Sequence, residues 1–544
     1  MWHARPAYQD MTGLSLARMG CNTWTQSQII SALWCFSRSQ SGGSEAARLD
    51  APDSEFAFPM KRSLLASLAL TAILSSNAVK GADRPAPPPN IILILTDDQG
   101  YGDASCNGNP ILRTPNLDRL HREGVRFEDF HVSPTCSPTR SSILSGKHEF
   151  KNGVTHTIHE RERLSLKSTT IAQVLKSAGY TTGIFGKWHL GDEDPYQPQH
   201  RGFDEVFIHG AGGIGQSYPG SCGDAPKNSY FSPVIRHNGR FVKTSGYCTD
   251  VFFDQAMAWI KSVKGDRPFF VYLTPNAPHT PLDCPPEYED RYAGKVGEKE
   301  AKFLGMVANI DDNVGRLLAS LRQLEIERRT LVIFLNDNGG TFGCSIHNAG
   351  MKGQKGTAHR GGTRAMSFWR WPGTLEPGAC HRLTAHVDIF PTLAELAGAR
   401  VPDDVRASLD GFSLVPLLRN PRAAWHDDRM LLTHVGRWPV GADPAKYGPC
   451  SVRWQRYLLW RAKDRWALFD LETDPGETTD IALEQLEVVT RLDRAYDAWW
   501  SAILPCLDNE QAHKTAPSIN PYRKLYWDQY QGPGPNNAPP EGKS

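Results

Sequence analysis

The sequence lacks the features that mark several common protein classes. No CxxC pair, Walker loop or HExxH segment occurs in its 544 residues, which argues against a thiolate zinc ribbon, a P-loop nucleotide site and a zincin protease. Neither charge sign is in excess, since 60 lysines and arginines face 59 acidic residues. The net charge of +1 creates no global field that would attract nucleic acid or anionic lipid. Any anion must therefore be held by a local site, and no nucleic-acid partner is expected.

An apolar run long enough to anchor the chain is also missing near the N-terminus. The run at residues 64–74 has 11 residues, whereas a membrane-spanning helix needs about 20. It follows Met60, Lys61 and Arg62 and precedes small residues at 76–78, which is typical of a signal peptide over residues 60–78. We therefore expect an exported protein, periplasmic or secreted, without a stable membrane anchor. Residues 1–59 are then an over-long upstream extension or a disordered segment; the alternative is a disordered extension ahead of an uncleaved anchor.

The composition of the chain is sufficient for a large hydrophobic core. The chain is 40% hydrophobic and 22% charged, which is typical of a large soluble globular protein. Residues 79–89 include a proline-rich stretch that predicts a stiff linker. Nine cysteines follow the signal peptide, and export to an oxidising compartment would permit disulfides, whose pairing stays open.

The order of apolar patterns predicts an α/β fold. Continuous apolar runs at 90–96, 268–273 and 330–335 are typical of strands buried on both faces of a parallel sheet. Amphipathic stretches at 115–123, 170–178 and 304–324 predict helices between them. Short strands at 429–434, 456–461 and 467–471, followed by a helix at 483–500, predict a smaller antiparallel subdomain. The expected architecture is a large, mixed but mostly parallel sheet sandwiched by helices (90–420), an antiparallel sheet with one helix (421–505) and a tail (506–544) that wraps the surface or is mobile.

Two polar pairs follow predicted strands. Asp97-Asp98 comes directly after the first strand, and Asp337-Asn338 follows the late one. The carboxyl ends of parallel strands share one edge of a sheet, so these four side chains are expected to meet. Three carboxylates and an amide oxygen suit calcium or magnesium, and we expect such a cluster to repel itself without a cation. Each pair alone could equally be a turn or a helix cap.

Between these pairs lies Cys136-Ser-Pro-Thr-Arg140, followed by a helical pattern that begins at the proline and ends at Gly146. A lone cysteine is ordinarily a buried thiol or half-cystine. This segment, however, resembles the Cys-x-Pro-x-Arg signature of the formylglycine-dependent (type I) sulfatases, which are arylsulfatase-like members of the alkaline-phosphatase superfamily. In that family a separate maturation enzyme oxidises the cysteine to an aldehyde.

The resemblance covers residues 90–419 and, more loosely, the region to about Trp500. The segment 179–191 is similar to the second sulfatase signature, with Lys187 and His189 at its functional positions. Residues 276–281 resemble the family's histidine loop and offer His279, and 336–340 match its second metal segment. Residues 352–356 supply Lys355.

The resemblance implies a function and a role for each of these residues. Asp97, Asp98, Asp337 and Asn338 would bind the metal ion together with residue 136, converted to formylglycine (3-oxoalanine). Arg140, Lys187 and Lys355 would stabilise the charge of a sulfate ester. One hydroxyl of the hydrated aldehyde would attack sulfur with help from Asp337, and His189 would take the proton of the other. His279 and Lys355 would lie near the leaving oxygen, where one acts as general acid. The predicted activity is hydrolysis of sulfate esters, of a sulfated polysaccharide or an aryl sulfate.

One departure from the family bears on the substrate. Where many sulfatases carry Tyr-Glu before paired glycines, this chain has His359-Arg360. Because a cation replaces an acid, we hypothesise that the change favours a polyanionic glycan. Two alternatives stay open: a phosphodiesterase or phosphonate monoester hydrolase of the same superfamily, and a catalytically silent glycan-binding homologue.

Overall fold

The computed structural model describes residues 87–216, 220–461 and 463–532. The predicted signal peptide, the residues before it and most of the predicted linker lie outside these ranges. Within them, no helix combines the length and the apolar character needed to cross a membrane. The described cysteines, nine in number, all carry free thiols.

Ten strands of the described chain form one large sheet, in the order β11-β2-β10-β9-β1-β8-β4-β5-β6-β7. The central strands β9, β1, β8, β4 and β5 are parallel, whereas β10 runs antiparallel to both its neighbours and β6 and β7 add an antiparallel edge. The expected mixed, mostly parallel α/β sheet is therefore confirmed. The strands are β1 (Asn90–Thr96), β2 (Val125–Phe127), β4 (Thr181–Lys187), β5 (Glu205–His209), β6 (Val234–His237), β7 (Arg240–Lys243), β8 (Phe269–Thr274), β9 (Thr330–Asn336), β10 (Ser367–Arg370) and β11 (Gly378–Cys380). A separate short pair consists of β3 (Phe130–His131) and β12 (Thr384–Ala385).

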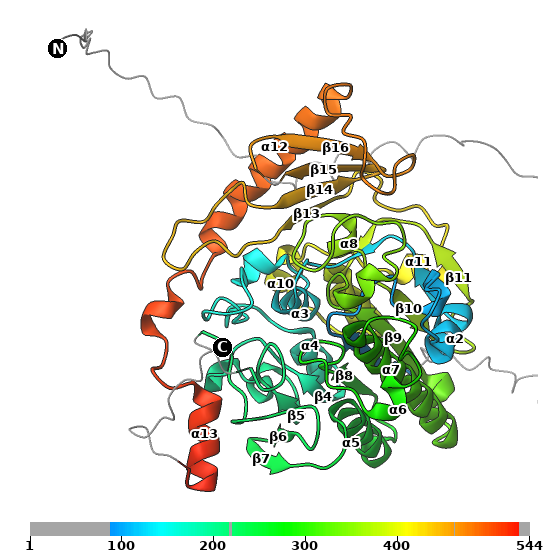
Figure 1. Ribbon diagram of the computed structural model, residues 1–544, viewed down its shortest axis with the longest axis vertical. Coiled ribbons are helices and arrows are strands. Elements are labelled where there is room, and N and C mark those ends of the chain that lie inside the picture. Colours follow the sequence, from blue (N-terminus) through cyan, green and yellow to red (C-terminus); the bar gives the residue numbers. More distant parts are fainter. Residues whose placement is uncertain (1–86, 217–219, 462, 533–544) are drawn as a thin grey trace, which may run out of the picture. The chain divides into compact units, whose positions relative to one another are not determined.

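The helices cover both faces of this sheet (Figure 1). In β1, Ile91, Leu93 and Leu95 pack into one apolar core, and Ile92 and Ile94 pack into the other. This alternation explains why the strand is apolar throughout, since both of its faces are buried. One core contains α3 (Cys136–Ser145), α4 (Ile171–Ser177), α9 (Ile389–Leu396), α10 (Asp403–Ser408) and α11 (Val415–Arg419), and the other contains α2 (Pro115–Glu123), α5 (Cys248–Val263) and α7 (Glu298–Gln323). Two short helices, α6 (Pro286–Glu289) and α8 (Arg360–Thr363), lie in connecting loops.

Two helices of the large domain differ from their predicted starts. Helix α3 begins at Cys136, not at Pro138, and its backbone carries the cysteine itself as first helical residue. Helix α7 begins at Glu298, six residues before the predicted start, because the apolar pattern weakens where acidic residues fill its first turn.

The N-terminus of α2 is capped from a distant part of the chain. Thr114 precedes the helix but makes no side-chain cap, and the Asp311 carboxylate of α7 accepts from the backbone N–H groups of Asn116 and Leu117 instead, at 2.7–3.1 Å. We expect Asp311→Ala to lower the free energy of unfolding by about 1–3 kcal/mol, because the substitution leaves these donors unpaired inside the protein. Denaturant unfolding measures this. The half-exposed neighbour Asp312 is the control, and equal losses in Asp312→Ala and Asp311→Ala would contradict the capping role.

A second, antiparallel sheet follows in the chain, in the order β13-β14-β15-β16. Its strands are β13 (Met430–His434), β14 (Cys450–Trp454), β15 (Tyr457–Arg461) and β16 (Trp466–Asp470), and α12 (Leu486–Ile503) lies across it (Figure 1). Leu492 and Tyr496 of α12 pack with Val452, Leu459 and Leu468. The predicted smaller sheet with one helix is thereby confirmed; β14 had no predicted counterpart. In the tail, α13 (Pro521–Tyr530) packs on β7 through Tyr526 and Phe241.

Stability should depend on pH through one buried histidine of this sheet. His434 donates from Nε2 to the Ala445 carbonyl and accepts at Nδ1 from the Gly436 N–H, so the neutral ring is fully paired. Burial lowers the pKa of His434 to about 4. The unfolded chain therefore binds this proton at higher pH than the folded chain does. We expect the free energy of unfolding to fall by up to about 3 kcal/mol as the pH drops from 6.5 to 4.

The comparison of wild type with His434→Asn isolates this contribution, because asparagine can still accept from the Gly436 N–H. Denaturant unfolding at a series of pH values should give a shallower decline for the variant between pH 6.5 and 4. Parallel curves for the two proteins would show that His434 does not carry the effect.

Candidate active site

Four neighbouring parallel strands deliver polar side chains to the same edge of the large sheet. Asp97 and Asp98 follow β1, and Asp337 and Asn338 follow β9. Lys187 is the last residue of β4, and His279 lies in the loop after β8. Arg140 of α3 pairs with Asp337, and Lys355 pairs with Asp98. Cys136, the first residue of α3, contacts His189, which follows β4, so the residues predicted for the metal and for catalysis lie in one region.

Three ion pairs neutralise the three carboxylates of this cluster. Lys187 Nζ lies 2.6 Å from Asp97 Oδ2, and Arg140 Nη2 lies 2.8 Å from Asp337 Oδ2. Lys355 pairs with Asp98. The expected repulsion within the acidic cluster is present, since the charge of Asp97 raises the pKa of Asp337. Each carboxylate also has its own cation, however, and these ion pairs offset the repulsion without a metal ion. The three cations predicted for catalysis and the three acids predicted for the metal are therefore paired with one another.

The environment sets the protonation of two of these acids in opposite directions. Burial, followed by the charge of Asp97, raises the pKa of Asp337 to about 6. Burial also opposes the ionised form of Asp98, but the charge of Lys355 outweighs it and holds the pKa of Asp98 below its usual range. The backbone at Asp98 is left-handed, with φ of 69°, a conformation that asparagine, aspartate and histidine tolerate better than most residues.

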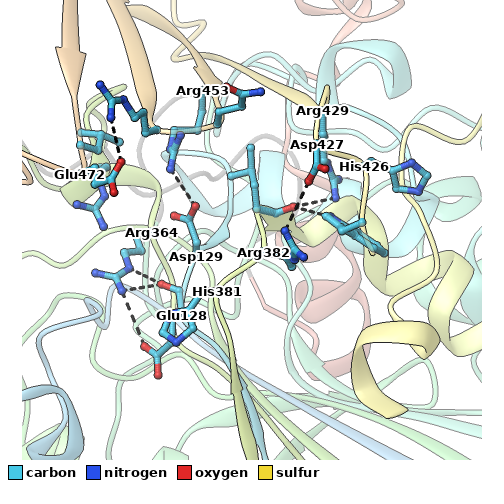
Figure 2. Close-up of a pocket in the computed structure, with 16 residues that line it drawn as sticks. Glu128, Asp129, Arg364, His381, Arg382, His426, Asp427, Arg429, Arg453 and Glu472 are labelled. Carbon is cyan, nitrogen blue, oxygen red and sulfur yellow. Dashed lines mark hydrogen bonds and ion pairs between the residues drawn. The ribbon is translucent and has the colours of Figure 1, made fainter. Parts of the chain in front are cut away.

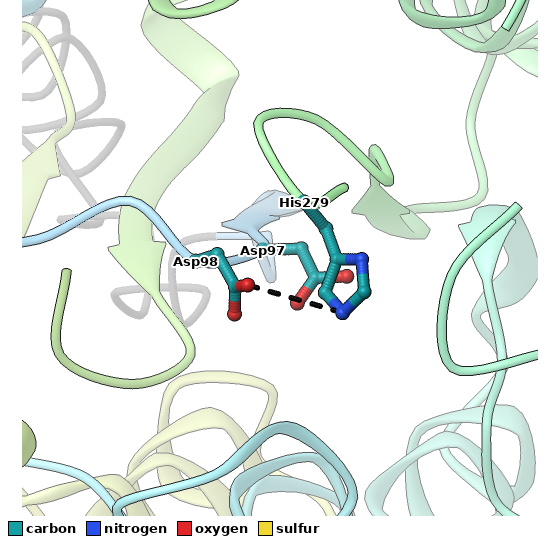
Figure 3. A group of neighbouring side chains, drawn as sticks. All are labelled: Asp97, Asp98 and His279. Atoms are coloured by element: carbon teal, nitrogen blue, oxygen red, sulfur yellow. Dashed lines mark ion pairs between the residues drawn. The ribbon is translucent and has the colours of Figure 1, made fainter. Parts of the chain in front are cut away.

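Unpaired oxygen atoms show that the cluster suits a metal ion. Asp97 Oδ1 and Asn338 Oδ1 are buried, and neither has a hydrogen-bond partner among the described residues. Buried acceptors of this kind cost free energy unless a cation or a proton donor faces them. Asp97, Asp98 and His279 also present ligand atoms that all lie within 4.8 Å of one another (Figure 3). The donor set of carboxylate, amide and imidazole therefore fits a divalent cation.

His279 faces this group with a lone pair. Its Nδ1 lies 2.7 Å from the Thr280 carbonyl, which only accepts, so Nδ1 carries the proton. The unprotonated Nε2 then points at Asp98 Oδ2, 3.8 Å away. Burial lowers the pKa of His279 to about 4. Two electron-rich atoms that face each other favour a cation between them. His279 can therefore contribute a ligand to a metal ion together with Asp97 and Asp98, in addition to lying near Lys355.

The side chain of Cys136 lies beside the unprotonated ring nitrogen of His189. It is the first residue of α3 and is 3% exposed. Its Sγ lies 3.5 Å from His189 Nδ1, and His189 Nε2 lies 2.8 Å from the Thr157 carbonyl. Because the carbonyl can only accept, the proton sits on Nε2 and the Nδ1 lone pair faces residue 136. Burial lowers the pKa of His189 well below its ordinary value, so the ring is a neutral base.

Two glycines that sequence reasoning missed help to form the site. A Cβ at Gly212 would lie 2.8 Å from His189 Cε1, and one at Gly213 would lie 2.7 Å from His279 Cε1. The loop can approach both histidines only because these residues have no side chain. The glycine-rich segment at 210–213, which follows β5, was the available signal. The backbone carbonyls of Thr157 and Thr280, which fix both tautomers, carry no such signal.

Comparisons with known proteins identify the family of this chain. The sulfatase family model matches residues 89–399, and a second model, the C-terminal part of N-sulphoglucosamine sulphohydrolase, matches residues 358–495. The chain belongs to the sulfatase family. The resemblance drawn from the motifs is thereby confirmed, and as a family member this sulfatase hydrolyses sulfate esters.

Its relatives include two human sulfatases. The chain is 30% identical to human arylsulfatase A over 452 residues, which covers 73% of this chain and 84% of the relative. It is 32% identical to human N-acetylgalactosamine-6-sulfatase, with 76% and 80% covered. Among solved structures, that of Ps i-CgsB in complex with k-i-k-neocarrahexaose is 28% identical, with a TM-score of 0.68 and coverage of 81% of this chain and 97% of that one.

Proposed function

We propose that this sulfatase is an exported enzyme that cleaves sulfate esters of a sulfated polysaccharide through a formylglycine made from Cys136. The observation that carries the proposal is the pairing of the Cys136 thiol with the basic nitrogen of His189 at 3.5 Å, next to the buried carboxylates. A maturation enzyme that generates formylglycine would supply the modification. The aldehyde, once formed and hydrated, would supply the nucleophilic oxygen that attacks sulfur.

We infer that calcium, or magnesium in its place, binds at the strand ends. Asp97, Asp98, Asp337 and Asn338 would hold it with residue 136, and the unpaired oxygens of Asp97 and Asn338 support this assignment. His279 is a further candidate ligand. The ion would add positive charge to a cluster whose three cations and three carboxylates already balance, which favours binding of an anionic ester.

The residues of the chain divide the remaining work. Lys187 and Arg140 are wholly buried and therefore keep fixed positions toward the sulfate group, which is how preorganised charges stabilise a transition state. Lys355 is also largely buried, and it could donate a proton to the leaving oxygen. His189, neutral and held by the Thr157 carbonyl, accepts a proton from residue 136 at Nδ1. A single histidine tautomer is thus preset for proton removal before substrate arrives.

The substrate class follows from relatives of stated specificity. Ps i-CgsB was solved with a carrageenan oligosaccharide, and N-acetylgalactosamine-6-sulfatase acts on the sulfate of an amino sugar, as its name says. Purified, matured enzyme should release sulfate from at least one member of a panel of sulfated glycans, measured by ion chromatography. Absence of sulfate release across the panel, with aryl sulfates included, would contradict the proposed activity.

The same purified enzyme distinguishes two alternative functions: hydrolysis of phosphate or phosphonate esters, and glycan binding without catalysis. A phosphonate monoester hydrolase from Agrobacterium radiobacter shares the fold at 22% identity and a TM-score of 0.55. Comparison of aryl sulfate with aryl phosphate and phosphonate esters distinguishes that chemistry, since a sulfatase prefers the singly charged sulfate. Turnover of any sulfate ester excludes a catalytically silent glycan-binding homologue.

A further inference from the structure

A large pocket lies between the two sheets, and its lining contains none of the residues of the catalytic cluster. It has a volume of about 810 Å³. The large-sheet side contributes the turn between β2 and β3 and helix α8, and the antiparallel sheet contributes β14 and the residues that follow it. Figure 2 shows Arg364 and Arg382 reaching the pocket from one side and Arg453 from the other. We call this the basic pocket; its charged lining residues are Glu128, Asp129, Arg360, Arg364, His381, Arg382, His426, Asp427, Arg429, Arg453, Arg456 and Glu472.

Most of its arginines already have acidic partners. Arg453 lies 2.9 Å from Asp129, and Arg382 lies 3.5 Å from Asp427. Arg456 pairs with Glu472 at 3.1 Å and with a second acid, Asp470. Arg429 is held by the buried Asp388, and Arg364 lies over the ring of Tyr101 while donating to the backbone carbonyl of Glu128. The remaining lining carboxylate, Glu128, pairs with Arg126 at 2.9 Å, so each acid that lines the pocket already has a basic partner.

Arg360 is the exception. Among the described residues, no carboxylate lies within 4.0 Å of its guanidinium, which donates a long hydrogen bond of 3.4 Å to the Pro475 carbonyl. Its Nε is buried and has no hydrogen-bond acceptor. Burial, followed by repulsion from Arg364, lowers the pKa of Arg360 to about 10. Asp129 and Glu477 attract Arg360 electrostatically, but neither forms an ion pair with its guanidinium. A partly buried cation with no ion-pair partner and an idle donor is stabilised by an added anion.

The neighbouring backbone explains why Arg360 is not neutralised internally. The carboxylate of Glu477 contacts this segment but does not pair with the Arg360 side chain. It accepts from His359 Nδ1 at 2.5 Å and from the Arg360 backbone N–H at 2.9 Å. His359 also stacks on Trp460, with ring centroids 4.3 Å apart. Because the Glu477 carboxylate is bound by His359, it does not neutralise the Arg360 side chain, which lines the pocket.

The pocket also offers a surface for a sugar ring. Trp425 lines it, and its indole nitrogen donates to the Leu383 carbonyl at 3.0 Å, which fixes the ring. An aromatic face beside guanidinium groups suits a sugar with anionic substituents, because the C–H face of a pyranose packs on the ring.

The chain links this pocket to the catalytic cluster. Lys355 and Arg360 belong to one loop, and the Gly356 N–H of that loop donates to the Pro134 carbonyl, two residues before Cys136, at 2.8 Å. The same short segment therefore positions a cation for the reacting sulfate and a cation for the basic pocket.

We propose that the basic pocket is a second anion-binding site, which holds a sulfate or carboxylate group of an acidic glycan through Arg360 with Arg382 and Trp425 beside it. The identification of that glycan as the substrate rests on the proposed function, whereas the binding itself does not. Arg360 acts here as a specificity-determining residue outside the reacting atoms.

Binding to the full chain carrying Cys136→Ala tests the site without turnover. Titration calorimetry would use three probes: a heparin hexasaccharide with sulfates and carboxylates, a hyaluronan hexasaccharide with carboxylates alone, and neutral cellohexaose. We expect the heparin probe to bind and Arg360→Gln in the same background to weaken it about tenfold, because a charge-assisted hydrogen bond is lost. Comparison with the hyaluronan probe tells which anionic group the pocket holds.

Matched variants keep the result unambiguous. Arg400→Gln removes an exposed arginine that does not line the pocket, and it should leave the affinity unchanged. Arg382→Gln, at a partly exposed position, replaces Arg360→Gln if thermal unfolding shows that the latter does not fold. Equal affinity in Arg360→Gln and Arg400→Gln, or binding of cellohexaose as tight as that of heparin, would overturn the proposal. Failure of the proposed function appears separately, as absence of sulfate release by the matured wild type.

Discussion

Replacing Cys136 with alanine should reduce hydrolysis of sulfate esters by about 10⁴-fold or more, since the proposed source of the nucleophile is removed and the remaining charges only bind the ester. The thiol is buried at the first residue of α3, 3.5 Å from the unprotonated nitrogen of His189. Steady-state rates with an aryl sulfate measure the loss. Peptide mass analysis should also show that residue 136 of the active protein has exchanged sulfur for oxygen and lost two hydrogens.

The chain supplies a matched control for this substitution. Cys248 is also a buried thiol at the first residue of a helix, α5, but it lies in an apolar core. Cys248→Ala should retain activity, and its peptide should show the mass of ordinary cysteine. A fully active Cys136→Ala variant would refute the mechanism.

Replacing Asp97 with asparagine should have the second large effect, on metal binding and on stability together. Asp97 pairs with the buried Lys187 at 2.6 Å and has a second oxygen without a partner. We expect calcium to raise the thermal unfolding temperature of wild type but not of Asp97→Asn, because binding to the folded state alone stabilises it. The metal-free variant should also lose about 3–5 kcal/mol of folding free energy, since Lys187 is left as an uncompensated buried charge. Hydrolysis should fall by at least about 10²-fold.

Asp388→Asn separates these two effects. Asp388 is likewise buried and pairs with a buried arginine, Arg429, at 2.7 Å, but it lies outside the catalytic cluster. This variant should lose stability and keep the shift of unfolding temperature with calcium. If Asp97→Asn responds to calcium as wild type does, Asp97 is not a ligand.

The prediction of the fold from sequence worked best for the central parallel strands. Both faces of β1, β8 and β9 are buried, so apolar residues occupy nearly every position and form continuous apolar runs in the sequence. Strand β4 was not predicted as a strand, although it lies in a recognised motif, because glycines and threonines interrupt its apolar character. Strand β10 runs antiparallel to its neighbours, and no pattern in four residues reports direction.

The candidate site shows the same division at the level of side chains. The amino-acid sequence by itself determined the candidates for the catalytic and metal-binding residues, because strand-end acids and the Cys136–Arg140 signature are local patterns. The tertiary structure alone decided how they are paired: Lys187 with Asp97, Arg140 with Asp337, and His189 turned toward Cys136. It also decided that Arg360 stays without an acid, because Glu477, more than a hundred residues later, is taken by His359. Charge pairing depends on distances between remote segments, and a local pattern in the chain does not contain those distances.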